Sequence, residues 1–194
     1  MAKAFEEIPF CGTPVDQKFA TNRGMIGALI APGPAAALAG KLDLFGRLVG
    51  SWDVDLISHR SDKLLPKHAE CEWHFGWVLG GRAIQDVWIA PKRALREGGD
   101  IGGEWGTMIR FYDKAMDAWR CTWHGPGRGV VRTFLARPSN SQIVLEGVFE
   151  DEGPLRWIFS GITNDSFHWR SVVSSDNWKT EQLIQEMFAR RQSG

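Results

Sequence analysis

The segment from residue 104 to 124 constrains the fold most, because it has the pattern of two β-strands joined by a tight turn. From Trp105 to Phe111, every second side chain is large or β-branched, which is the period of a strand whose two faces meet different surroundings. The polar stretch 113–117 has the composition of a turn. The strand that follows places three apolar side chains on one face: Trp119, Cys121 and Trp123. The segment is therefore predicted to be a β-hairpin.

Strand patterns continue on both sides of this hairpin, with turn residues between them. Ten strands are expected, at about 52–56, 69–77, 84–89, 104–112, 119–123, 130–136, 142–150, 155–162, 167–174 and 178–188. A long antiparallel sheet tends to close, because closure removes its unpaired edges. We therefore expect an all-β, up-and-down antiparallel barrel of about nine or ten strands over residues 50–191. Eight strands already hold side chains or one small ligand, so a wider barrel should contain a cavity.

The segment before the barrel is expected to differ in kind. Residues 1–32 have no sustained period and are predicted to form an irregular arm, which could pack on the domain or on a second subunit. A homodimer is therefore one alternative. Residues 33–49 begin with a Gly-Pro pair, continue with good helix formers and an apolar Leu/Phe stripe, and end before Gly50, so they predict a short helix.

Charge and hydropathy favour a soluble cytoplasmic protein. The chain has 23 basic and 23 acidic residues without a long block of either sign, so no nucleic acid and no membrane is expected as its main partner. The apolar stretch 25–40 is too short and too weakly apolar to span a bilayer of about 30 Å. Cys11, Cys71 and Cys121 are odd in number and lack metal-type spacing, which favours reduced thiols.

A family resemblance supports the barrel. Gly50-Ser51-Trp52 opens the first strand after a helix and resembles the Gly-x-Trp opening of calycins, the superfamily of lipocalins and fatty-acid-binding proteins. The stretches 80–88 and 108–113, with the paired Trp119 and Trp123, resemble a bacterial family of calycin-like barrels whose function is not established. The resemblance implies a fold and a pocket rather than a reaction. It also implies that Arg190 or Arg191 stacks on Trp52 across the base of the barrel.

Two charged residues lie at strand centres, where a charge is costly unless it is paired. Arg110 lies in the central hairpin, and Asp86 occupies a similar place between Ile84 and Val87. If both side chains point inward, Arg110 could bind Asp86, or a carboxylate or carbonyl of a ligand. Alternation fixes the relative orientation of the side chains but not the absolute one, so an outward orientation stays open.

The leading hypothesis is a binding protein for a small hydrophobic or aromatic molecule with an acidic or carbonyl group. Aromatic walls and a polar anchor at Arg110 would form the site. The residues expected to bind the ligand are Trp73, Trp77, Trp88, Arg110, Tyr112, Trp123, Trp169 and Arg170. His168 and Arg170 share a strand face, which either faces water, the favoured interpretation, or lines a wet cavity.

The alternative is an enzyme without a cofactor, such as a lyase, isomerase or cyclase, acting in the same cavity. Asp86, Tyr112 or His168 would then be the acid or base, and Arg110 would stabilise developing negative charge. A carboxylate or imidazole within about 3 Å of the arginine would favour this alternative. A cavity walled only by apolar side chains would favour plain binding.

Metal and haem sites have less support. Glu72 and His74 share a strand face and His124 ends the central hairpin, but nothing in the sequence brings the three together, so no metal site is expected. Haem is a second alternative, because some calycin-like barrels bind it through histidine. No pattern singles out a ligand among His59, His68, His74, His124 and His168. The sequence also lacks a phosphate loop, a dinucleotide fingerprint and the Gly-x-Ser-x-Gly motif, so no cofactor is predicted.

Overall fold

The computed structural model describes residues 23–60, 64–96, 102–151 and 153–193. Its helical elements are α2 (Arg23–Leu29), η1 (Ala36–Leu38), α3 (Ala39–Gly46) and η2 (Arg93–Leu95). Its strands are β1 (Gly50–Ser58), β2 (His68–Val78), β3 (Ala83–Ala90), β4 (Glu104–Asp113), β5 (Ala118–Gly125), β6 (Val130–Ser139), β7 (Gln142–Phe149), β8 (Gly153–Ser160), β9 (Ser166–Val173) and β10 (Gln182–Arg191).

The ten strands form one closed antiparallel barrel, which confirms the predicted fold. Each strand pairs with its neighbours in sequence, and β1 pairs with β10 to complete the ring. That last ladder aligns Trp52 with Arg191 and Ser58 with Gln185. Every strand therefore has a partner on both sides, and the barrel has no open edge.

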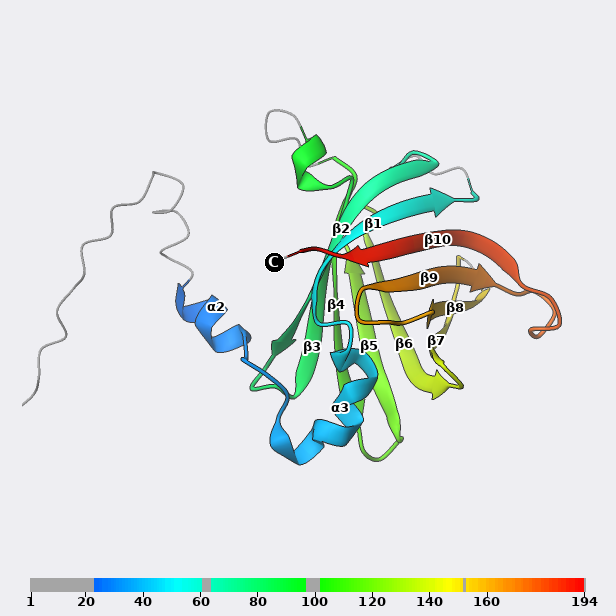
Figure 1. The fold of residues 1–194 in the computed structure, drawn as a ribbon. Coiled ribbons are helices and arrows are strands. Elements are labelled where there is room, and N and C mark those ends of the chain that lie inside the picture. Colours follow the sequence, from blue (N-terminus) through cyan, green and yellow to red (C-terminus); the bar gives the residue numbers. More distant parts are fainter. Residues whose placement is uncertain (1–22, 61–63, 97–101, 152, 194) are drawn as a thin grey trace, which may run out of the picture.

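One end of the barrel is closed by α3 (Figure 1). Leu42, Phe45 and Leu48 have no solvent-exposed surface. The ring of Phe45 meets Trp119 edge to face at 4.9 Å and Phe159 at 6.2 Å between ring centroids. The apolar stripe of the helix thus belongs to the barrel core, and any cavity must lie toward the opposite end.

The base has the arrangement implied by the calycin resemblance. The guanidinium of Arg191 lies 4.0 Å from the ring centroid of Trp52. It also donates to the carbonyls of Val49 at 2.8 Å and Arg47 at 3.1 Å, just beyond the end of α3. Trp52 donates its indole N–H to the carbonyl of Leu48 at 2.8 Å. Of the two predicted arginines, Arg191 makes this contact.

The structure differs from the sequence prediction at both ends of the chain. Helix α2 lies within the part expected to be irregular, and the helical segment of η1 and α3 covers 36–46 rather than 33–49. The last strand was predicted from Trp178 but begins at Gln182. Its first predicted residues instead form a turn, in which Thr180 donates through its N–H and hydroxyl to Asp176, at 2.9 and 2.7 Å.

The helices and the cysteines were expected to be short of a membrane span and reduced, respectively. Within the described ranges, the helices are all too short or too polar to cross a membrane. Cys71 and Cys121 are buried free thiols. Cys11 lies outside the described residues.

The central strand β4 is oriented with Arg110 inward. Glu104, Met108 and Arg110 are buried, whereas Trp105 and Phe111 are each 44% exposed on the outer face. The face with more aromatic side chains is therefore the outer one. This orientation puts the charged residue of the strand into the lumen.

Candidate functional site

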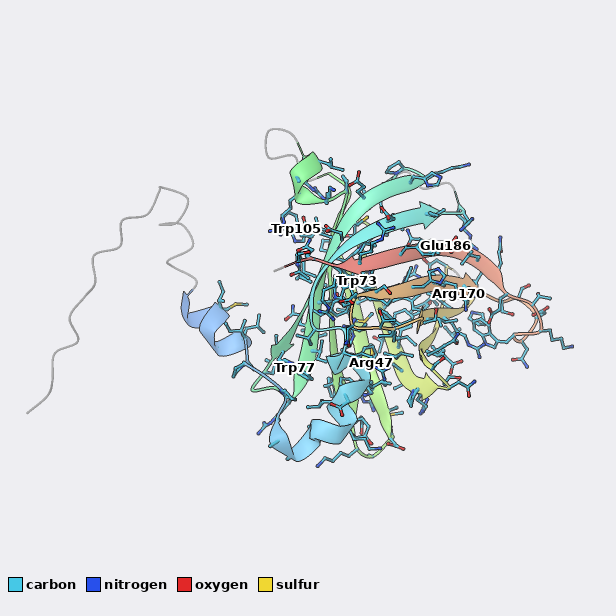
Figure 2. All side chains as sticks on the ribbon, in the orientation of Figure 1. Arg47, Trp73, Trp77, Trp105, Arg170 and Glu186 are labelled. Carbon is cyan, nitrogen blue, oxygen red and sulfur yellow. The ribbon has the colours of Figure 1, made fainter. Side chains whose placement is uncertain are left out.

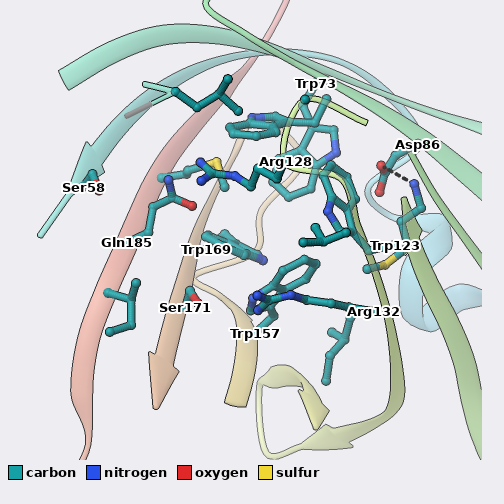
Figure 3. Close-up of a pocket in the computed structure, with 18 of the residues that line it drawn as sticks. Ser58, Trp73, Asp86, Trp123, Arg128, Arg132, Trp157, Trp169, Ser171 and Gln185 are labelled. Atoms are coloured by element: carbon teal, nitrogen blue, oxygen red, sulfur yellow. Dashed lines mark hydrogen bonds between the residues drawn. The ribbon is translucent and has the colours of Figure 1, made fainter. Parts of the chain in front are cut away.

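The barrel encloses a cavity of about 550 Å³ on the side of the lumen away from α3. This volume is within the usual range for small-molecule sites, about 300–1,000 Å³. Inward-facing residues of the strands supply aromatic walls: Trp73, Trp88, Trp123, Trp157, Phe159 and Trp169. Several of these rings meet edge to face, as in the pair of Trp157 and Trp169 at 5.4 Å and 63° (Figure 3). The lumen is therefore partly filled by indoles but not plugged by them.

A buried ion pair forms the floor of the cavity. Arg110 donates through Nη2 to Oδ2 of Asp86, and the two side chains are 1% and 0% exposed (Figure 3). The backbone N–H of Met108 donates to the other carboxylate oxygen at 3.2 Å. The guanidinium lies 4.9 Å from the ring centroid of Phe45 and 5.3 Å from that of Phe75, so cation–π contacts also stabilise it.

Burial dominates the electrostatics of this floor. It raises the pKa of Asp86, whereas the charge and hydrogen bond of Arg110 act in the opposite direction. It also raises the pKa of the nearby Cys121 thiol to about 12. Nε and Nη1 of Arg110 are buried and have no hydrogen-bond partner in the described part of the chain. The floor therefore contains donor groups that no acceptor among the described residues satisfies.

The mouth of the cavity is polar and rich in arginine. Arg132 donates to Asp151 at 2.8 Å, and Nε of Arg128 lies 3.8 Å from the buried carboxylate of Glu104. Arg128 lies over the cavity in Figure 3, and Arg60 also lines it. Among the described residues, four arginines and two aspartates line the cavity, and the Glu104 carboxylate lies beside one of these arginines. The mouth therefore carries charges of both signs.

The structure brings together five of the eight predicted ligand-binding residues. Those that line the cavity are Trp73, Trp88, Arg110, Trp123 and Trp169. Trp77 lies near the closed end, with its ring against Gly46 of α3 (Figure 2). Tyr112 also lies at that end, where it donates to Asp117 and contacts Lys41. Arg170 is on the outer face of β9, beside Glu186 of β10.

Of the three predicted acid and base residues, one lines the cavity and two do not. Asp86 lines the cavity, and its carboxylate is hydrogen-bonded to Arg110. A carboxylate in hydrogen-bond contact with this arginine is the arrangement that the enzyme alternative requires. His168 faces outward, its Nε2 is 3.0 Å from Glu186, and its ring stacks on Phe188 at 4.5 Å. Neither His168 nor Tyr112 reaches the cavity.

The suggested metal ligands do not form a site. His74 contacts Glu72 at 3.0 Å on the outside of β2, where the guanidinium of Arg93 lowers the pKa of Glu72 to about 2. Among the described residues, no group of three or more His, Cys, Asp or Glu side chains is placed to hold a metal ion. None of the five histidines, all of which lie in the described ranges, lines the cavity or offers an imidazole to a haem iron there.

Comparisons with known proteins add a fold similarity only. No family model and no curated protein matches the chain. Among solved structures, an S-type phycobiliprotein lyase from Guillardia theta is similar, with a TM-score of 0.48 and 15% sequence identity over 78% of this chain and 92% of that one. At this identity and TM-score, the similarity says nothing about the ligand.

Sequence reasoning missed the polar residues of the mouth. Arg128 lies between the predicted strands 119–123 and 130–136, where a turn is expected, and this position puts it at the rim of the barrel. Arg132 shares a strand face with Phe134 and Ala136, which are core residues, so its inward orientation could have been inferred from the period of two. Gln185 could not have been found this way, because a register shift in β10 moves it.

Proposed function

We propose that this barrel binds a small, largely apolar molecule that carries a carboxylate or carbonyl group. The observation that carries the proposal is the pair of unsatisfied guanidinium nitrogens of Arg110 at the floor of an aromatic-walled cavity. A buried donor without a partner costs about 1–3 kcal/mol, and more when charged. A ligand oxygen at this position would satisfy it.

The surroundings of Arg110 support this ligand chemistry. Asp86 holds one guanidinium nitrogen and so fixes the orientation of the other two. Phe45 of α3 and Phe75 of β2 also contact the guanidinium with their rings. An anchor fixed in this way loses little side-chain entropy on binding, which favours affinity.

The test is a titration of intrinsic tryptophan fluorescence with palmitate, 2-naphthoate and haem. We expect saturable binding of at least one carboxylate. The double variant Arg110→Met/Asp86→Leu removes both charges and leaves no unpaired ion. It should weaken carboxylate binding by about ten- to a hundredfold, because a hydrogen bond to a charged group contributes about 1.5–3 kcal/mol.

The matched control is Arg170→Met, which removes an arginine from the outer face of β9. This variant should bind like the unchanged protein. Indifference to all three compounds, or equal weakening by the control, would contradict the proposal.

A second candidate function has one observation in its favour, the Asp86 carboxylate in contact with Arg110 inside the cavity. Asp86 would take a proton from the carbon next to a ketone, and Arg110 would stabilise the enolate oxygen. The carbon would then regain a proton from Asp86, so no oxidant or cofactor is consumed.

This activity is measured as deuterium exchange next to the carbonyl of aryl ketones such as 1-tetralone, by NMR in D₂O. We expect exchange above the buffer rate, and its loss in Asp86→Asn. A rate equal to that of buffer, or one unaffected by the substitution, would leave plain binding as the function.

A further inference from the structure

Three indole N–H groups in the cavity wall lack partners, and the anchor at Arg110 does not account for them. Nε1 of Trp73, Trp88 and Trp169 is buried without a hydrogen-bond partner in the described ranges. All three residues line the cavity, and their side chains are 3–5% exposed. An indole N–H can only donate, so each needs an acceptor oxygen or nitrogen, and no described residue supplies one in hydrogen-bond geometry.

These donors are distributed along the wall rather than gathered at the floor. Trp73 and Trp88 are direct cross-strand neighbours in the ladder of β2 and β3. Trp169 comes from β9, and its ring meets that of Trp73 edge to face at 6.2 Å. The Trp73 N–H is close enough to Asp86 to lower its pKa, against the larger effect of burial, but it makes no hydrogen bond of normal geometry.

The distribution of donors restricts the body of the ligand as well as its head group. An aliphatic chain would occupy the volume but leave all three indoles unsatisfied, each at a cost of about 1–3 kcal/mol. A flat conjugated body also suits walls built from indole and phenyl rings, because aromatic rings pack well against one another in offset or edge-to-face geometry.

We propose that the ligand is a planar multi-ring compound with carbonyl or phenolate oxygens on its ring edges. This inference rests on the proposed binding function and narrows it. The acidic or carbonyl head group meets Arg110, and the ring oxygens accept hydrogen bonds from the indoles of the wall. Fatty acids are then poor ligands, although they carry the right head group.

The first test compares two ligands that differ only in their ring oxygens. Anthraquinone-2-carboxylate and anthracene-2-carboxylate have the same three rings and the same carboxylate. Titration calorimetry is the readout, because it does not depend on the tryptophans that are later substituted. We expect the quinone to bind about five- to thirtyfold more tightly, since a neutral hydrogen bond contributes about 1 kcal/mol and two oxygens are available.

The second test removes one donor at a time. Trp169→Phe keeps an aromatic ring in the wall but deletes an N–H, and should cost the quinone about fivefold in affinity and the anthracene almost nothing beyond lost packing. Trp73→Phe is the second variant if Trp169→Phe does not fold. Trp105→Phe is the matched control, because Trp105 lies on the outer face of β4 and does not line the cavity. It should leave the affinities for both ligands unchanged.

The outcomes separate this inference from the proposed function. Equal affinities for the two ligands would mean that water satisfies the indoles, and would overturn the inference while leaving the Arg110 anchor intact. A quinone preference that survives Trp169→Phe and Trp73→Phe would also overturn it. If neither ligand binds and palmitate, 2-naphthoate and haem do not bind either, the binding function itself fails.

Discussion

At the scale of single residues, Gly106 determines how much of the lumen stays open. A Cβ atom at this position would lie 2.2 Å from the Trp123 ring and 2.9 Å from the carbonyl of His124, so the indole rests directly on the glycine. Gly106→Ala should therefore push Trp123 into the cavity. We expect a loss of about 1–3 kcal/mol in the free energy of unfolding, the usual cost of overpacking, measured by urea denaturation. Carboxylate binding should weaken as well.

The control for this substitution is Gly76→Ala in β2. A Cβ atom at Gly76 would meet nothing within 4 Å. Alanine should be neutral or slightly stabilising there, because glycine is unfavourable inside a strand. Equal destabilisation by the two substitutions would show that backbone preference, rather than the contact with Trp123, causes the effect.

The residues of the floor show how far sequence reasoning reaches at this scale. The high cost of a strand-centre charge correctly drew attention to Arg110 and Asp86, and the structure pairs them. Their inward orientation could not be derived, because alternation gives only relative faces. Hydrophobicity would even have favoured the wrong face of β4, since Trp105 and Phe111 lie on the outside. Trp105 is partly covered there by the guanidinium of Arg96, 5.6 Å from its ring.

At the scale of elements, turn composition predicted the number of strands and most of their limits. The start of β10 was placed four residues too early, because the alternation of the sequence extends into a turn held by the Asp176 side chain. A register shift between Leu183 and Gln185 is a second local feature without a sequence signal. It brings the successive residues Ile184 and Gln185 to the cavity, which regular alternation would not allow.

The packing of helix α3 is also only partly predictable from the sequence. Its Leu/Phe stripe is visible in the sequence and predicts that the helix packs against apolar surface. The sequence does not say that Phe45 enters the end of the barrel and contacts both Trp119 and Arg110. This contact joins the closing helix to the floor of the binding site. The location of the cavity thus depends on tertiary packing and not on any local pattern.

At the scale of the whole molecule, closure of the ring depends on two segments far apart in sequence. β1 and β10 pair over seven aligned residue pairs, from Trp52 with Arg191 to Ser58 with Gln185. The Arg191 side chain adds contacts between the two ends of the barrel beyond the β1–β10 ladder. Its guanidinium donates to the carbonyls of Val49, Arg47 and Asn164 and stacks on Trp52. One side chain therefore holds together the last strand, the first strand and the segment after α3.

Arg191→Ala should lower the free energy of unfolding by about 2–4 kcal/mol, because it removes the hydrogen bonds of a charged group to three backbone carbonyls and a cation–π contact with the buried Trp52 ring. Arg191→Lys should restore only part of this, since an ammonium cannot reproduce the planar fork of a guanidinium. The control is Arg190→Ala at the adjacent position, where the side chain is 79% exposed and lies 3.8 Å from Asp55. Such a surface pair contributes about 0–1 kcal/mol. Urea denaturation of the four proteins measures the difference, and similar midpoints for Arg191→Ala and Arg190→Ala would mean that the barrel closes without this side chain.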